Sequence, residues 1–148
     1  VIHALHKGSD LIVPVKPNTI AKSIAIGNPA DGYYVLRAVR DSGGWGEAVT
    51  DQEIVEAIQL LAQTEGIFTE PAGGTTVAVA KKLIEQGRIP RNESIVISIT
   101  GNGYKTIEAV MGHVNQLFTI NARLQDFDSL YQSLAATVAS PVPAAELH

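Results

Sequence analysis

The chain has 148 residues, of which 45% are hydrophobic and 18% charged, and this length and composition predict one domain with a single core. Its net charge of -4 repels phosphate backbones and anionic lipid, so we expect neither a nucleic-acid nor a membrane partner. The absence of cysteine excludes disulfides and cysteine-ligated zinc, and together with the lack of a signal-peptide core it makes the cytoplasm the expected location.

The first residues give mixed signals. The chain starts Val1-Ile2-His3 without a methionine, which suggests a fragment of a longer protein. The β-branched residues Ile12, Val13 and Val15 favour a strand, whereas Pro14 and Pro17 restrict it to an edge or an extended connector. We therefore expect residues 1–18 to be a connector or a partial element at a truncated boundary.

Three helices are predicted from signals at their ends. Asn28-Pro29 is a typical start and Gly43-Gly44 a typical stop, which predicts a helix over 29–42. Residues 50–53, with the sequence Thr-Asp-Gln-Glu, have capping-box form, and Gly66 suits a left-handed cap, so a second helix is expected between them. A third helix, rich in small residues, is expected from about residue 74 to residue 87.

Between and after these helices the sequence predicts strands. Residues 45–49 suit a short connection or strand, and residues 67–70 a short strand ended by Pro71. Residues 94–99 are β-branched at four of six positions, as in a strand buried in a parallel sheet, and residues 118–124 alternate apolar with polar. A short amphipathic helix over 127–134 and a disordered tail over 139–148 follow. This alternation predicts an α/β fold, a layered sheet with flanking helices.

Two segments have the form of ligand-binding loops at strand ends. Residues 100–103, Thr-Gly-Asn-Gly, place a hydroxyl after a buried strand, and two glycines there permit close backbone approach to a ligand. Residues 70–74 place a carboxylate, Glu70, before small residues that open a helix. The alternative interpretation is that Gly101 and Gly103 only turn the chain and that Glu70 only caps a helix. His3 and His6 lack a third ligand, so no metal site is predicted.

Three ordered motifs resemble a known family. Residues 19–29 (TIAKSIAIGNP), 65–72 (EGIFTEPA) and 100–105 (TGNGYK) together resemble the C-terminal half of the threonine synthase family. This family belongs to the pyridoxal-phosphate enzymes of the tryptophan-synthase β-like superfamily, fold type II. The resemblance implies an α/β fold in which residues 19–138 form the C-terminal part of the cofactor-binding domain. The sequence departs from the common pattern in two places, at the pair Gly73-Gly74 and at Asn102.

The resemblance also implies roles for individual residues. Thr100 would face the pyridine nitrogen of pyridoxal phosphate, and a neutral hydroxyl there tunes the ring as an electron sink. Glu70 matches a carboxylate near the ring, Gly27 a loop over the ring face, and Gly101 and Gly103 would let the backbone approach the cofactor. The Schiff-base lysine of the family lies N-terminal to these motifs, so no catalytic residue is assigned and the fragment alone is expected to be inactive.

The resemblance implies that the intact enzyme converts O-phosphohomoserine and water to threonine and phosphate. Expected partners are this small-molecule substrate, the missing N-terminal half of the same protein, and further copies in a homo-oligomer. Two alternatives stay open: a threonine or serine dehydratase of the same fold, and a stand-alone, non-catalytic module that binds a ligand or another chain.

Overall fold

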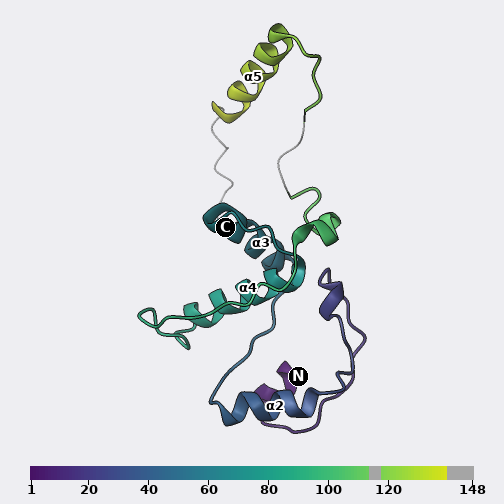
Figure 1. Ribbon diagram of the computed structural model, residues 1–148, viewed down its shortest axis with the longest axis vertical. Coiled ribbons are helices and arrows are strands. Elements are labelled where there is room, and N and C mark those ends of the chain that lie inside the picture. Colours follow the sequence, from purple (N-terminus) through teal and green to yellow (C-terminus); the bar gives the residue numbers. More distant parts are fainter. Residues whose placement is uncertain (114–117, 140–148) are drawn as a thin grey trace, which may run out of the picture. The chain divides into compact units, whose positions relative to one another are not determined.

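The computed structural model describes residues 1–113 and 118–139, with side chains described to residue 135. The chain divides into two compact units, Val1–Val114 and Asn115–His148. The first unit contains six helical elements, whose bounds are α1 Ile2–His6, η1 Lys22–Ile24, α2 Gly32–Asp41, α3 Asp51–Glu65, α4 Pro71–Glu85 and η2 Gly103–Ala109 (Figure 1). The second contains α5, Leu124–Ala139.

A small core joins α1 to α2. Leu36 of α2 is fully buried and packs with Ala4 and Leu5 of α1, and Ile12 covers the same cluster. The predicted helix over 29–42 is confirmed, but it begins at Gly32 and ends at Asp41, before Gly43, whose φ of 66° is left-handed. The helix α1 was not predicted, because the connector expected over residues 1–18 left no helix there.

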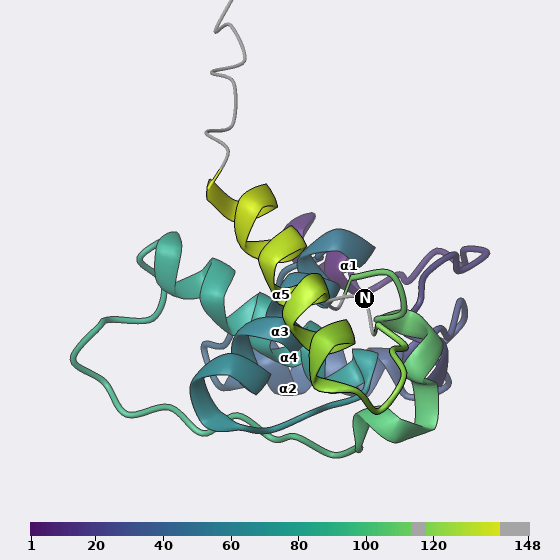
Figure 2. The same cartoon turned by 90° about the horizontal axis from the view of Figure 1, so that it is seen from above.

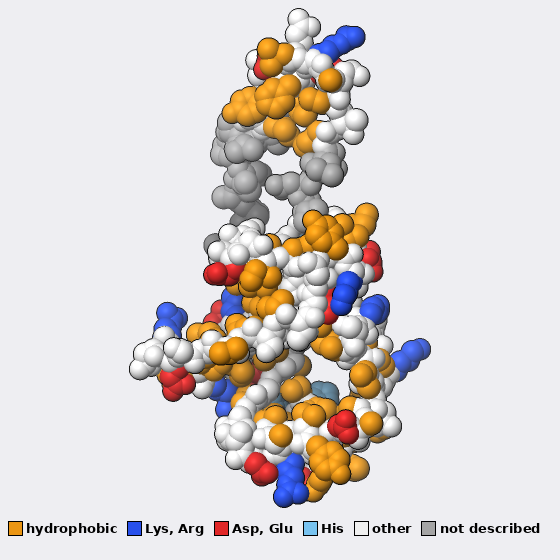
Figure 3. Space-filling view, viewed as in Figure 1, with side chains coloured by type: hydrophobic (Ala, Val, Ile, Leu, Met, Phe, Trp, Pro, Cys, Tyr) orange, Lys and Arg blue, Asp and Glu red, His pale blue; other side chains and the backbone are white. Residues whose placement is uncertain are grey.

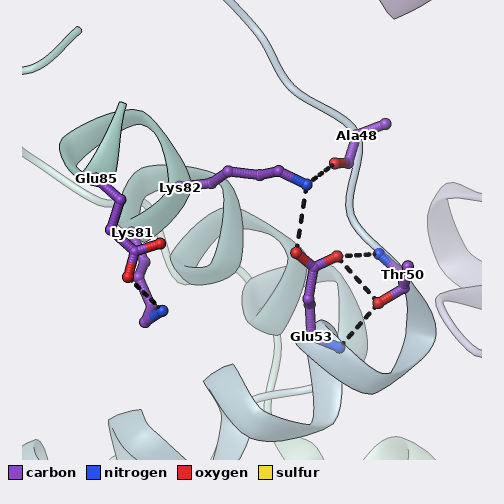
Figure 4. Close-up of polar contacts among 6 residues, drawn as sticks. All are labelled: Ala48, Thr50, Glu53, Lys81, Lys82 and Glu85. Carbon is purple, nitrogen blue, oxygen red and sulfur yellow. Dashed lines mark hydrogen bonds and ion pairs between the residues drawn. The ribbon is translucent and has the colours of Figure 1, made fainter. Parts of the chain in front are cut away.

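The helix α3 begins and ends at the predicted signals. The Glu53 backbone N–H donates to the Thr50 hydroxyl at 3.2 Å, and the Thr50 N–H donates to the Glu53 carboxylate at 2.6 Å (Figure 4). This capping box satisfies two N–H groups that a helix start otherwise leaves unpaired. The hydrogen bonds from Thr50 lower the pKa of the Glu53 carboxyl. Gly66 ends the helix with a φ of 67°.

The helix α4 packs against α3 and begins earlier than predicted. It starts at Pro71, three residues before the expected Gly74, because proline lacks the N–H that a first helical residue would leave unpaired. A Cβ at Gly74 would lie 2.6 Å from Ile58 Cγ1 and 2.9 Å from the Ile54 carbonyl oxygen. The glycine therefore lets the two helices lie close together, as the ribbon views show (Figures 1 and 2).

The predicted strands do not form in the described residues. The only β-pairing among residues 1–113 and 118–139 is an isolated antiparallel bridge between Thr69 and Asn102. Residues 94–99 form no strand and Val96 is 95% exposed, and residues 118–123 likewise form no strand. The physical reason is that a strand needs a neighbour for its N–H and C=O groups, and neither segment has one in the described chain. The layered sheet predicted from the sequence is therefore not seen.

The second unit consists of one amphipathic helix and the segment before it. The helix α5 includes the predicted 127–134 and extends beyond it at both ends. Phe127 and Tyr131 stack with ring centroids 6.1 Å apart and are both exposed, and Figure 3 shows a group of hydrophobic side chains on this helix. Most of the predicted tail, residues 140–148, lies outside the described residues. None of the helices in the described ranges is long and apolar enough to cross a membrane.

Candidate functional site

Two of the three motifs are held side by side by backbone pairing. The Glu70 N–H donates to the Gly101 carbonyl at 3.1 Å, and the Gly103 N–H donates to the Phe68 carbonyl at 3.0 Å. The buried Thr69 hydroxyl adds a bond to the Gly101 carbonyl at 3.0 Å. Residues 68–70 and 101–103 therefore form one structural unit, although about thirty residues separate them in the sequence.

Glu70 lies at the centre of this unit. It is 8% exposed and occupies the N-cap position of α4, but its side chain accepts no capping hydrogen bond from the helix. Its carboxylate instead lies beside Gly101, where a Cβ would come 1.8 Å from Glu70 Oε1. Glu70 is therefore a helix cap by its backbone position, but its side chain does not cap the helix and packs beside Gly101 instead.

The glycines at 101 and 103 are required by packing inside the chain. Neither has a positive φ, so neither is needed for a left-handed turn. A Cβ at Gly103 would come 2.6 Å from the Phe68 ring. A Cβ at Gly101 would likewise collide with the Glu70 carboxylate. The Phe68 ring in turn contacts Tyr104 edge to face, with centroids 5.4 Å apart. Neither glycine behaves as a simple turn residue.

Thr100 lies at the edge of an open hollow of about 450 Å³. The hollow is lined by hydroxyls and apolar groups without a charged side chain: Ile24, Ala72, Thr75, Thr76, Val79, Ser98 and Thr100. Among the residues that the structure describes, none forms a hydrogen bond with the Thr100 hydroxyl. This hydroxyl is therefore available to a ligand in the hollow.

The remaining predicted residue, Gly27, belongs to a different part of the first unit. Its carbonyl accepts a hydrogen bond from the Val15 N–H at 3.0 Å, and a Cβ on it would come 1.9 Å from the Val15 carbonyl oxygen. Gly27 lines another hollow, of about 690 Å³, together with residues of α1. The structure thus brings Glu70, Gly101 and Gly103 together, with Thr100 next in the chain, and gives Gly27 other neighbours.

Sequence reasoning missed several side chains of the site. Thr69 and Phe68 lie inside the second motif but were not singled out; the sequence showed a hydroxyl next to Glu70, and its burial is visible only in the structure. Thr75 and Thr76 reach the hollow from α4, and no sequence pattern distinguished them from ordinary helix residues. Asn102 accepts a hydrogen bond from the Tyr104 N–H at 2.9 Å and so begins η2.

Thr106 is a further polar residue just beyond the third motif. It lies at a kink within η2, with φ and ψ of -145° and 50°. Its hydroxyl oxygen is shielded from solvent and has no hydrogen-bond partner among the described residues. An unpaired buried hydroxyl costs about 1–3 kcal/mol, so this position destabilises the described fold.

Comparisons with known proteins agree with the motifs. Residues 1–101 match the family described as pyridoxal-phosphate dependent enzyme. The chain is similar to a threonine synthase from Methanocaldococcus jannaschii, 49% identical over 112 residues, which are 75% of this chain and 28% of the relative. A threonine synthase from Methanosarcina acetivorans is 38% identical over 84% of this chain and 31% of the relative. One from Halalkalibacterium halodurans is 43% identical over 68% of this chain and 28% of the relative.

The chain therefore spans less than a third of the length of these relatives. The matched family region covers the first two motifs and ends at Gly101, within the third. It includes Gly27, Glu70 and Thr100, and pyridoxal phosphate is the cofactor from which the family takes its description. The chain belongs to the pyridoxal-phosphate dependent enzyme family.

Proposed function

We propose that this chain forms the C-terminal part of a threonine synthase, which converts O-phosphohomoserine and water to threonine and phosphate. The similarity to relatives named threonine synthase supports this reaction. The observation that carries the proposal is Thr100, which lines an open hollow and directly precedes Gly101, the residue that is hydrogen-bonded to Glu70. The cofactor ring would be bound at the Thr100 hydroxyl.

The chemistry of the hollow fits the cofactor. A pyridine ring needs apolar contacts on its faces and a hydrogen-bonding group at its nitrogen, and Val79, Ala72 and Thr100 are groups of these kinds. A hydroxyl carries no charge, so it does not hold the pyridine nitrogen protonated as a carboxylate would. Bound pyridoxal phosphate would supply an electron sink that stabilises negative charge on substrate carbon.

The other residues would hold and orient this part of the site. The Glu70 carboxylate, fixed beside Gly101, would lie near the ring, and Gly103 allows the Phe68 ring to pack behind the loop. Gly27 would approach the ring face from the other part of the unit. The lysine that carries the cofactor is supplied by the N-terminal half in this proposal, so the chain alone is inactive.

We also propose that residues 94–99 become a strand of a layered α/β sheet when that half is present. Their four β-branched side chains suit a strand, and Ile99 already packs against Ala57 and Val77 between α3 and α4. Residues 19–138 would then form part of the cofactor-binding domain of a cytoplasmic homo-oligomer. Without that half, the exposed Val96 and its neighbours favour self-association.

The experiment that tests the function is an assay on the full-length protein that contains this chain. With pyridoxal phosphate bound, it should release inorganic phosphate from O-phosphohomoserine and form threonine in equal amount. Formation of keto acid from free threonine or serine, without phosphate release from O-phosphohomoserine, would replace the synthase with a dehydratase. Absence of both reactions in a cofactor-loaded protein would refute the enzyme proposal.

Thr100→Val in the same protein tests the residue that carries the proposal. Removing one hydrogen bond that stabilises charge developing in a transition state lowers turnover by about 100-fold or more, and we expect a loss of this size here while the fold is little changed. Thr100→Ser, which keeps the hydroxyl, should restore most of the turnover. The matched control is Thr64→Val on the exposed surface of α3, which should leave turnover unchanged. Equal turnover for Thr100→Val and wild type would remove Thr100 from the site.

A further inference from the structure

The first unit contains separate hydrophobic cores, and the candidate site residues do not all lie near the same one. Leu36 and Ile12 belong to the core of α1 and α2. Val15, three residues after Ile12, donates its backbone N–H to the Gly27 carbonyl, so Gly27 is attached to this core. Glu70 instead begins α4, which packs on α3 around other cores. The position of Gly27 relative to Glu70 and Thr100 therefore depends on what joins these parts.

Trp45, in the connector between α2 and α3, contacts both parts. The His6 ring of α1 stacks on the Trp45 ring, with centroids 4.9 Å apart and planes 13° from parallel. The Arg88 guanidinium, just beyond the end of α4, lies 3.9 Å from the centroid of the same ring. A guanidinium at this distance is attracted by the electron density of the indole face. One side chain thus links α1 to the end of α4.

Polar contacts hold the connector against α1. His6 Nε2 of α1 lies 2.9 Å from the Gly46 carbonyl oxygen, and within the connector the Trp45 indole N–H donates to the Glu47 carboxylate at 3.1 Å. The bond from Trp45 is the main reason why the pKa of the Glu47 carboxyl is lowered. A Cβ at Gly46 would come 2.8 Å from Ile2 Cδ1, so a larger residue there would have to displace the end of the Ile2 side chain on α1.

The last turns of α4 hold the other side of the connector. Lys82 Nζ donates to the Ala48 carbonyl at 3.0 Å and to the Glu53 carboxylate at 3.3 Å (Figure 4). Gly87, with a left-handed φ of 70°, turns the chain after the helix and leads into Arg88. These contacts come from the C-terminal end of the helix whose N-terminal end carries Glu70.

We propose that Trp45 and Arg88 form a clasp that sets the position of the α1–α2 core, and with it Gly27, relative to the α3–α4 pair that carries Glu70. Both are positioning residues, since they act through the elements that they join. Other attachments, such as η1 packed on α4 and the Ile20 N–H that donates to the Asp51 carboxylate of α3 at 3.1 Å, do not involve Trp45 or Arg88, so loss of the clasp would loosen the two parts without separating them. Its importance for the cofactor site rests on the proposed function, whereas its existence does not.

A distance measurement on this chain tests the clasp without cofactor or substrate. The chain has no cysteine, so Arg37→Cys on α2 and Glu65→Cys on α3 place two spin labels at exposed positions in the two parts. Arg88→Gln should raise the fraction of molecules outside the main interlabel distance about threefold, as expected when an exposed cation–aromatic contact is lost. Arg91→Gln, which changes an exposed arginine three residues further on, is the matched control and should leave the distribution unchanged.

The fluorescence of Trp45 gives an independent measurement, because it is the only tryptophan in the chain. Arg88→Gln should increase acrylamide quenching of this fluorescence, Arg88→Lys should restore part of the protection by keeping the cation, and Arg91→Gln should have no effect. Circular dichroism confirms that each variant keeps its helices. The proposal is overturned if Arg88→Gln leaves both the distance distribution and the quenching at their parent values. An inactive enzyme with an intact clasp would refute only the proposed function.

Discussion

The close contact between Gly101 and Glu70 leads to a quantitative prediction about Gly101→Ala. The new Cβ would come 1.8 Å from Glu70 Oε1 and 2.2 Å from its carboxyl carbon, whereas ordinary contacts begin near 3.4 Å. Glu70 is buried, so its carboxylate has to move by more than 1 Å against packed neighbours. Overpacking of this kind costs about 1–3 kcal/mol, and we expect the upper half of that range.

A double-mutant cycle tests this reasoning. Glu70→Ala removes the atoms that the new methyl group would meet, so Gly101→Ala should cost less in a Glu70→Ala background than in the parent chain. We expect a coupling free energy of about 1–2 kcal/mol between the two substitutions. The assay is urea unfolding followed by circular dichroism for the parent, both single variants and the double variant.

Gly103 provides the matched control. A Cβ there would meet the Phe68 ring at 2.6 Å, so Gly103→Ala should also destabilise the chain, and Glu70→Ala should not relieve its cost. Additive free energies for Gly101→Ala and Glu70→Ala would refute the contact on which the site is built. Equal coupling of Glu70→Ala to both glycines would show a general loosening of the loop instead of this contact.

Two further predictions concern the start of α3. Thr50→Ala should lower the free energy of unfolding by about 1 kcal/mol through loss of the N-cap. The control Thr64→Ala, in the same helix, should change it by less than about 0.5 kcal/mol. Equal urea midpoints for the two variants would contradict the cap. Hydrogen bonds from Thr50 hold the pKa of the Glu53 carboxyl below its ordinary value, so the folded chain binds fewer protons there than the unfolded chain. That stabilisation is complete above the unfolded pKa and is lost as pH falls through the folded pKa. In Glu53→Gln the free energy of unfolding should therefore decrease less steeply than in the parent chain as the pH is lowered from neutral to about 3. An unchanged slope in urea titrations across that range would count against this assignment.

The helices could be predicted because their ends are encoded locally. The capping box of Thr50 and Glu53 and the left-handed Gly66 act within a few residues of the helix that they delimit, so the sequence alone located α3. The start of α4 was placed too late, because Pro71 was interpreted as the end of a strand although proline equally suits a first helical turn. Short helices such as α1 carry too few residues for a periodic pattern.

The strands and the clasp depend on distant residues. Residues 94–99 have the composition of a buried strand, but their pairing requires a neighbour that the described chain does not provide. The motifs predicted that Glu70, Gly101 and Gly103 matter, whereas the actual reason for both glycines, contact with Glu70 and Phe68, emerges only in three dimensions. Nothing local links Trp45 to Arg88, so no sequence pattern could have paired them.

The bridge between Thr69 and Asn102 closes the chain into a loop that contains all of α4. Its two ends are tied by backbone hydrogen bonds, and the turn at residues 90–93 is exposed. Lengthening a closed loop is inexpensive, since doubling its length costs only about 0.6 kcal/mol. This turn is therefore a natural place to insert a peptide tag or a protease cleavage site, and a cut there leaves the two halves of the candidate site hydrogen-bonded to each other.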